Sequence, residues 1–179
     1  MEERTVSTRT AFTGRLLRLR VDTVLLDSGR RATREIVEHP GAVAICAWDG
    51  QQLAVVRQWR QAAGSVMLEI PAGTLDPGEL PHTAAERELA EECGLAAAEW
   101  EEGPTFFTAP GFSTEQLTLF LATGLRAVSV QMPDDEQLEP SWLALHDALD
   151  AADAGGIHDA KSLAGIYWLA RRLAHDTGG

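Results

Sequence analysis

Short segments that mix or alternate apolar and polar residues run along the first third of this chain, separated by turn signals. Residues 16–26 have this mixed character, Asp27-Ser28-Gly29 follows as a turn, and residues 31–37 return, which predicts an antiparallel hairpin. A second hairpin is predicted from residues 41–48 and 53–59, joined by Asp49-Gly50, a dipeptide typical of tight hairpin turns. The first third of the chain is therefore predicted to be β-structure.

The middle of the chain carries the clearest helical pattern. An apolar strand is predicted at residues 67–70, and Asp76-Pro77-Gly78 marks a turn after it. Pro81 suits the first turn of a helix, where a missing N–H costs nothing, and Gly94 suits the left-handed residue that ends one. The apolar side of this helix is formed by Ala84, Ala85, Leu89 and Ala90.

The remainder of the chain predicts further strands and then two helices. Strands are expected at residues 105–108 and 116–123, an acidic loop at 132–140, and helices at 143–152 and 159–175. Strands followed by a helix, and again by helices, are typical of an α+β sandwich in which helices cover a mixed sheet.

Composition narrows the class of protein. A chain of 179 residues with 45% hydrophobic content can bury a full core, and one domain is the default expectation. The net charge of −12 argues against a nucleic-acid partner, and it means that an anionic substrate needs cations at its site. Cys46 and Cys93 are not spaced for zinc and are expected to be reduced thiols. No signal segment or membrane-length apolar run is visible, so a cytoplasmic protein without a membrane partner is expected.

Three glutamates on the predicted helix are the candidates for chemistry. Glu88 and Glu92 are one helical turn apart, and Glu91 is three residues from Glu88, so their carboxylates lie on one face and repel each other. Oxygen ligands gathered in this way suit Mg²⁺ or Mn²⁺. The alternative is a solvated acidic helix face, which is what most charge runs are. The five histidines do not cluster in sequence, and none is predicted to be catalytic.

The residues around these glutamates carry a longer motif. Gly73, Glu79, Arg87-Glu88-Leu89 and Glu91-Glu92-Cys93-Gly94-Leu95 fit the pattern G-x5-E-x7-R-E-U-x-E-E-x-G-U at every fixed position, where U is a bulky aliphatic residue. This segment resembles the signature of the Nudix hydrolases, which cleave nucleoside diphosphates linked to a further group. The resemblance implies an α/β/α sandwich. It also implies that two or three Mg²⁺ or Mn²⁺ ions bind Glu88, Glu91, Glu92 and the Ala72 carbonyl, while Glu79 and Arg87 orient the ligands.

Further stretches resemble one branch of that family, the ADP-ribose pyrophosphatases. The matching segments are residues 34–43, 56–60, 69–73 and 109–115, with Pro110 at the place where the branch usually carries a proline. The resemblance implies an N-terminal antiparallel β extension at residues 1–38 that forms a homodimer, and a catalytic domain at 39–179. The two subunits are then expected to share each active site, which is reasonable because a small isolated hairpin is marginally stable.

Substrate contacts are expected at five side chains of these segments. Arg57 and Arg60 have opposite parity on a strand or lie at its end, so both cannot face the core, and as bidentate donors they suit phosphate. Surface ion pairing is the alternative for both. The resemblance adds Arg34, places Glu115 near the ribose or the attacking water, and makes Phe12 a candidate for stacking on adenine. The alternative for Glu115 is a solvated loop carboxylate, and the alternative for Phe12 is an ordinary core or interface residue.

The acidic loop is expected to supply the catalytic base. Residues 134–139 resemble a region of the branch in which a mobile glutamate approaches the metal ions, and by register that residue is Glu136, with Asp134 second. The loop departs from the branch's more usual Asp-Glu-Asp-Glu, because this chain has Pro133-Asp134-Asp135-Glu136. Glu91 or the metal ions alone could activate the water instead, and an acidic turn without a role is the other alternative.

The expected activity is Mg²⁺-dependent hydrolysis of ADP-ribose to AMP and ribose 5-phosphate. Another nucleotide sugar, such as GDP-mannose, would leave the same signature intact. A nucleotide-sensing module that binds without turnover is a different class of protein. Such a module usually shows broken signature carboxylates or an attached DNA-binding domain, and this sequence shows neither.

Overall fold

The computed structural model describes residues 2–130 and 137–176, and the chain forms two compact units. The first unit contains residues 1–41 and 106–117, and the second contains residues 42–105 and 118–179. The division at residue 38 that the sequence suggested stays a prediction. In the described residues, no helix is both long enough and apolar enough to cross a membrane.

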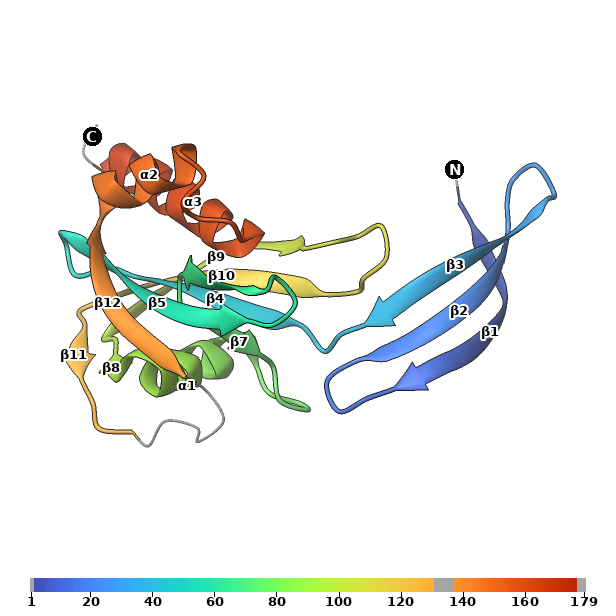
Figure 1. Cartoon of the computed structure of the whole chain (residues 1–179), viewed down its shortest axis with the longest axis horizontal. Helices are drawn as coiled ribbons and strands as arrows, with labels where there is room; N and C mark the ends of the chain where they lie inside the picture. The colour runs from blue at the N-terminus through green and yellow to red at the C-terminus, as the bar shows by residue number, and fades with distance from the viewer. Residues whose placement is uncertain (1, 131–136, 177–179) are drawn as a thin grey trace. The chain divides into compact units, whose positions relative to one another are not determined.

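The first unit is built on a three-stranded antiparallel sheet in the order β1-β2-β3 (Figure 1). Its strands are β1 (Arg4–Thr13), β2 (Arg18–Leu25) and β3 (Arg31–Glu38). The hairpin predicted between residues 16 and 37 is confirmed as β2 and β3, with Gly29 at φ 79° in the turn. The sequence analysis missed β1, because all ten of its residues are exposed and no apolar alternation marks it.

The loop after β9 (Glu99–Phe107) is attached to β3 within the first unit. The Val37 N–H donates to the Phe112 carbonyl at 2.7 Å, and the Thr114 N–H donates to the Val37 carbonyl at 2.9 Å. This segment, predicted only as a loop between strands, therefore continues the edge of the N-terminal sheet.

The second unit contains mixed sheets and the helices. A four-stranded sheet has the order β7-β4-β10-β9, and a three-stranded sheet has the order β12-β5-β6. Besides β9, whose bounds are given above, the strands and helices are β4 (Ala42–Ala47), β5 (Gln52–Arg60), β6 (Ser65–Glu69), β7 (Ala72–Thr74), α1 (Pro81–Cys93), β8 (Leu95–Ala96), β10 (Gln116–Thr123), β11 (Arg126–Ala127), β12 (Leu138–Ala144), α2 (Leu145–Asp153) and α3 (Ala160–Asp176).

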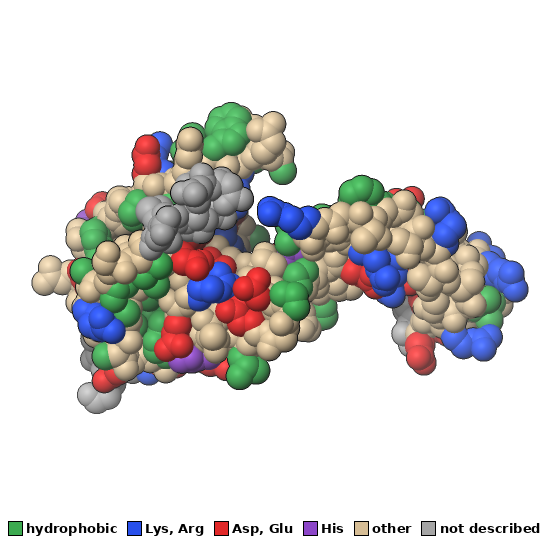
Figure 2. All heavy atoms as spheres, turned by 90° about the horizontal axis from the view of Figure 1, so that it is seen from below, with side chains coloured by type: hydrophobic (Ala, Val, Ile, Leu, Met, Phe, Trp, Pro, Cys, Tyr) green, Lys and Arg blue, Asp and Glu red, His purple; other side chains and the backbone are tan. Residues whose placement is uncertain are grey.

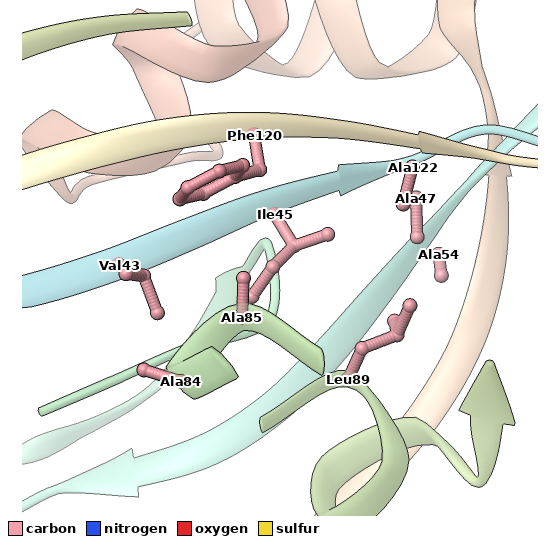
Figure 3. Packing of buried hydrophobic residues seen from close by; sticks show 9 residues of the cluster. All are labelled: Val43, Ile45, Ala47, Ala54, Ala84, Ala85, Leu89, Phe120 and Ala122. Carbon is pink, nitrogen blue, oxygen red and sulfur yellow. The ribbon is translucent and has the colours of Figure 1, made fainter. Parts of the chain in front are cut away.

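The helices cover the central strands from opposite sides. In Figure 1, α1 lies on one side of β4 and β10, while α2 and α3 lie on the other. Figure 3 shows α1 side chains directed toward β4 and β10, and its labelled residues are almost fully buried. Removing this apolar surface from water stabilises the layers by about 25 cal/mol per Å². The predicted sandwich of helices on a mixed sheet is confirmed.

The second predicted hairpin is wrong beyond its turn. The turn itself forms, since Asp49 Oδ1 accepts the N–H groups of Gln51 and Gln52 at 2.7 Å and Gly50 has φ 103°. After one bridge between Trp48 and Leu53, however, β4 and β5 enter different sheets. Both edges of β5 are taken by β6 and β12, and both edges of β4 by β7 and β10, so neither strand has an edge left for the other.

Several predicted boundaries also shift. The acidic loop expected at 132–140 gives way to β12 from Leu138, which pairs with β5, and residues 131–136 lie outside the described part. The strand expected at 67–70 is β6, and a further short strand, β7, follows Pro71. The sequence analysis also missed β8, β11 and the first half of β9. The two predicted C-terminal helices are confirmed within two residues as α2 and α3.

Candidate active site

Helix α1 is oriented by its apolar residues. It begins at Pro81, and it ends at Gly94, which has φ 63° and whose N–H bonds to the Ala90 carbonyl at 3.0 Å. Ala84, Ala85 and Leu89 are fully buried against the sheet, which fixes the rotation of the helix. As a result Glu88 and Glu92 are also buried, with exposed fractions of 9% and 4%. The solvated-helix alternative is therefore wrong for these two residues.

The buried carboxylates lie against strand β7. Glu92 Oε2 accepts the Ala72 N–H at 2.9 Å. Glu88 packs against Gly73 so closely that a Cβ at position 73 would lie 1.9 Å from Glu88 Oε1. Position 73 of the signature therefore excludes every residue with a side chain unless the Glu88 carboxylate moves.

Arg87 links the signature residues through one guanidinium. Its Nε and Nη2 donate to the two carboxylate oxygens of Glu79 at 3.0 and 2.9 Å. Its Nη1 donates to Glu88 Oε1 at 2.7 Å and to Glu91 Oε2 at 3.1 Å. Nη2 also donates to the Thr74 carbonyl at 3.2 Å. The guanidinium thus holds two of the three helix carboxylates side by side, next to β7.

The charges of this group stabilise one another. The bond to Glu79, followed by those to Glu88 and Glu91, raises the pKa of Arg87 well above its ordinary range. The bond from Arg87 lowers the pKa of Glu79, and the Asp76 N–H, which donates to Glu79 Oε2 at 2.9 Å, acts in the same direction. Figure 2 shows acidic side chains gathered around basic ones on the face seen from below. We call Glu88, Glu91 and Glu92 the glutamate face.

The residue types of the glutamate face fit a hard cation. Carboxylates and a backbone carbonyl are the ligands that Mg²⁺ and Mn²⁺ prefer, and the group contains no thiolate or imidazole. Within residues 2–130 and 137–176, no three His, Cys, Asp or Glu side chains form a ready-made metal cluster. The carboxylates are arranged instead around the Arg87 cation and the Ala72 amide.

Arg60 lies at the end of β5 and is held by a buried carboxylate. Its Nε and Nη2 donate to Glu69 Oε1 and Oε2 at 2.8 and 2.7 Å. That bond raises the pKa of Arg60, and the charges of Glu69, Glu92 and Asp159 raise it further, so Arg60 lies within electrostatic reach of Glu92. Arg57 is exposed on the same strand, opposite Leu68 on β6 and Glu139 on β12.

Two charged residues beside Arg60 were missed by the sequence analysis. Lys161 donates to Glu69 and, at 2.9 Å, to Asp159. Both belong to the segment Asp159-Ala-Lys-Ser162 at the start of α3, nearly a hundred residues from Glu69 in sequence. Composition could have drawn attention to Lys161, because it is the only lysine in the sequence.

The other expected substrate contacts belong to the first unit. Arg34 bonds to Glu3 and to the Thr33 carbonyl, Glu115 accepts a bond from Thr108, and Phe12 is 56% exposed. Arg34 also lines a hollow of about 390 Å³ together with Phe107 and Phe112. Arg34 and Glu115 are thus ion-paired or hydrogen-bonded rather than simply solvated. Glu136 and Asp134, the candidates for the base, lie outside the described residues.

The comparisons with known proteins agree with the fold and with the signature. The model of the NUDIX domain matches residues 38–164, and that of the nucleoside diphosphate sugar hydrolase N-terminal domain matches residues 3–37. The chain therefore belongs to the Nudix family. With the signature intact, it is a Nudix pyrophosphatase, an enzyme of a family that generally uses divalent metal ions.

Individual relatives match almost the whole chain. ADP-ribose pyrophosphatase of Bacillus subtilis is 37% identical, covering 94% of this chain and 93% of the relative. ADP-ribose pyrophosphatase of Mycobacterium tuberculosis is 41% identical over 90% of this chain and 80% of its own length. A methanol dehydrogenase activator of Bacillus methanolicus is 37% identical over 94% and 92%.

A solved structure supports the fold. The crystal structure of an ADP compounds hydrolase superimposes with a TM-score of 0.87 and covers 99% of this chain and 97% of its own. At 22% identity this likeness concerns the fold alone.

Proposed function

We propose that this enzyme hydrolyses the pyrophosphate bond of ADP-ribose to AMP and ribose 5-phosphate, with Mg²⁺ or Mn²⁺ as cofactor. The observation that carries the proposal is the glutamate face, where Arg87 bonds to Glu88 and Glu91 and the Ala72 amide bonds to Glu92. The choice of ADP-ribose is supported by two relatives of 37% and 41% identity that bear the name ADP-ribose pyrophosphatase.

The glutamate face and the Ala72 carbonyl would hold two or three ions. Bound there, a divalent ion would neutralise the pyrophosphate and lower the pKa of a water molecule. Arg87 and Glu79 act through the ligands, because the guanidinium that Glu79 holds with both oxygens contacts Glu88 and Glu91 directly. Gly73 leaves the space that the Glu88 carboxylate needs beside β7.

Substrate binding is assigned to the arginines and to the first unit. The Arg60 side chain is 38% exposed while it remains bound to Glu69, so it can meet a phosphate without giving up its bidentate partner. Arg57 is the more exposed cation of the same strand. Arg34, Glu115 and Phe12 are proposed to contact the adenosine or ribose, and Glu136 to position or deprotonate the attacking water.

We also propose that the chain is a homodimer in which the extension of residues 1–38 forms the interface and both subunits contribute to each site. The support is physical: β1 is exposed along its whole length, including Val6 at 44% and Phe12 at 56%. Exposed apolar residues on a small sheet are typical of an association surface.

A product assay tests the proposed substrate. ADP-ribose, GDP-mannose, NADH and 8-oxo-dGTP are each incubated with the enzyme, with and without Mg²⁺, and products are separated by chromatography. We expect Mg²⁺-dependent release of AMP from ADP-ribose at the highest kcat/KM. A preference for GDP-mannose would show that GDP-mannose, rather than ADP-ribose, is the substrate of the same hydrolysis. Tight binding of ADP-ribose without turnover of any compound would contradict an enzyme and favour a sensing module.

A further inference from the structure

Lys161 holds an unusual position for a lysine. It is the only lysine in the sequence, and its side chain is 15% exposed. Its Nζ donates to Glu69 Oε2, and to Asp159 Oδ2 at 2.9 Å. Lysine side chains are seldom buried to this extent unless they are paired, so the two carboxylates account for its burial.

Glu69 is the centre of a charged group that consists of Arg60, Glu69, Asp159 and Lys161. Its side chain is 1% exposed, and it receives two bonds from Arg60 and one from Lys161. Burying a carboxylate is unfavourable unless it is paired and hydrogen-bonded, and these three donors provide the compensation. With Asp159 the group contains two cations and two anions, and it is balanced only as long as Lys161 is present.

The same turn of α3 also holds the chain that leads to the glutamate face. The Ile70 N–H donates to Ser162 Oγ at 2.9 Å, and the Ser162 N–H donates to Asp159 Oδ2 at 3.0 Å. Two residues after Ile70, the Ala72 N–H bonds to Glu92. Lys161 and Ser162 therefore fasten residues 69 and 70 to α3 immediately before the segment that contacts the glutamates.

We propose that Lys161 is a positioning residue for the pyrophosphatase reaction. Lys161 pairs with both Glu69 and Asp159, so the two carboxylates are balanced by two cations, and Arg60 stays at the edge of the group, where its remaining N–H groups meet a substrate phosphate. Without the lysine, Arg60 is the only cation beside two carboxylates, Glu69 and Asp159, and it is drawn toward them and away from the substrate. The inference rests on the phosphate contact of Arg60 in the proposed function.

The test compares Lys161→Met, which removes the charge at similar length, with Lys161→Arg, which keeps it. We expect the methionine variant to raise KM for ADP-ribose at least about tenfold while kcat changes by less than about threefold, because a ground-state phosphate contact is weakened. The affinity for α,β-methylene ADP-ribose, measured by calorimetry, should fall by a similar factor. Lys161→Arg should restore most of the affinity.

Two controls separate positioning from general stability. In an Arg60→Gln background, Lys161→Met should cause no further change in KM, because coupled residues are not additive. Arg172→Met removes another cation of α3 that is bound to a carboxylate, Glu101 at 2.9 Å, and should leave KM unchanged. Lys161→Gln gives the same comparison if the methionine variant does not fold.

The inference would be overturned if Lys161→Met and Lys161→Gln left KM unchanged. It would also be overturned if Lys161→Met raised KM equally in the unmodified protein and in the Arg60→Gln background. The assay of the four substrates with the unmodified enzyme tests the proposed function independently of the Lys161 variants. If another nucleotide sugar is the preferred substrate, the same variants are compared on that compound. If nothing is cleaved, calorimetry with the methylene analogue still measures the coupling between Lys161 and Arg60, and absence of coupling there also overturns the inference.

Discussion

At the scale of single residues, the candidate site depends on close complementarity between Gly73 and Glu88. The carboxylate occupies the space that a side chain at position 73 would fill, and Arg87 and the Ala72 amide fix the neighbouring carboxylates. Three glutamates on one helix face repel each other, and the single Arg87 cation, bonded to Glu88 and Glu91, offsets part of that cost. An arrangement that costs stability is expected where function requires it.

The glutamate face gives the first prediction. Glu88→Gln and Glu92→Gln should each lower kcat at least about 100-fold at saturating Mg²⁺, which corresponds to about 2.7 kcal/mol of the barrier. The melting temperature should stay close to that of the unmodified protein, because glutamine keeps an oxygen that accepts the bond from Arg87 or from the Ala72 amide, while the repulsion between the carboxylates falls. Steady-state kinetics and calorimetric unfolding measure the two effects. Glu86→Gln, an exposed position on the same helix, is the matched control, and near-normal turnover of Glu92→Gln would disprove the metal assignment.

The Arg87–Glu79 pair predicts a pH dependence of stability. The pKa of Glu79 is lowered in the folded protein, chiefly by its bond from Arg87, so its contribution is fully present above the unfolded pKa, about 4.3. That contribution is lost as the pH falls through the folded pKa. The difference in unfolding free energy between the unmodified protein and Glu79→Gln should therefore be largest near neutral pH and should shrink below about pH 4.3. Urea titrations at a series of pH values measure it; a constant difference down to pH 3 would contradict the assignment.

At the scale of elements, helix α3 stabilises a segment that lies far from it in sequence. The Ser162 hydroxyl is fully buried and satisfies the Ile70 N–H, and the absence of a Cβ at Gly165 permits close approach of the Ile70 side chain. The C-terminal helix therefore does more than cover the sheet. It holds Ile70, which lies between the end of β6 and the start of β7, two residues before the Ala72 amide that bonds to Glu92.

Ser162→Ala tests this connection. The substitution leaves the Ile70 N–H without its partner, and a buried unsatisfied donor costs about 1–3 kcal/mol. For a chain of this length each kcal/mol lowers the melting temperature by roughly 2–4 °C. Calorimetry should show a loss in that range for Ser162→Ala and almost none for Ser141→Ala, which changes an exposed serine on β12. Equal melting temperatures of the two variants would show that the bond contributes little.

At the scale of the whole molecule, charge is the dominant property. The chain carries a net charge of −12, and its proposed substrate is also anionic. Arginines supply local positive charge, but Arg34, Arg60 and Arg87 are each already bound to at least one carboxylate. Divalent ions are the proposed source of the additional positive charge for a pyrophosphate, and we therefore expect ion binding and substrate binding to be interdependent.

Ion binding should be visible in the stability of the whole molecule. Under the proposed function, Mg²⁺ or Mn²⁺ binds only the folded protein, at the glutamate face, so adding it should raise the melting temperature, and α,β-methylene ADP-ribose should raise it further. A ligand at a hundredfold excess over its Kd stabilises by about 2.7 kcal/mol, which is easily measured by differential scanning fluorimetry. Stabilisation by Zn²⁺ alone, with none from Mg²⁺, would contradict an all-oxygen site.

The features that depend on local chemistry could be predicted from the sequence. Pro81 and Gly94 fix the ends of α1 through φ preferences, and the spacing of Glu88 and Glu92 puts their carboxylates on one helix face. The Asp49-Gly50 turn formed for the same local reason. The signature motif also identified the family, since it constrains residue types across a complete loop and helix.

The pairing of the strands and the contacts between distant charges depend on the folded chain and could not be predicted from local patterns. The turn at Asp49-Gly50 forms, but β4 and β5 separate because competing strands occupy their edges. Strand β1 has no buried face, so no periodicity reveals it. Lys161 and Glu69 meet because packing brings α3 to the end of β6, and a pairing between residues so far apart in the chain depends on the assembled core rather than on any local preference.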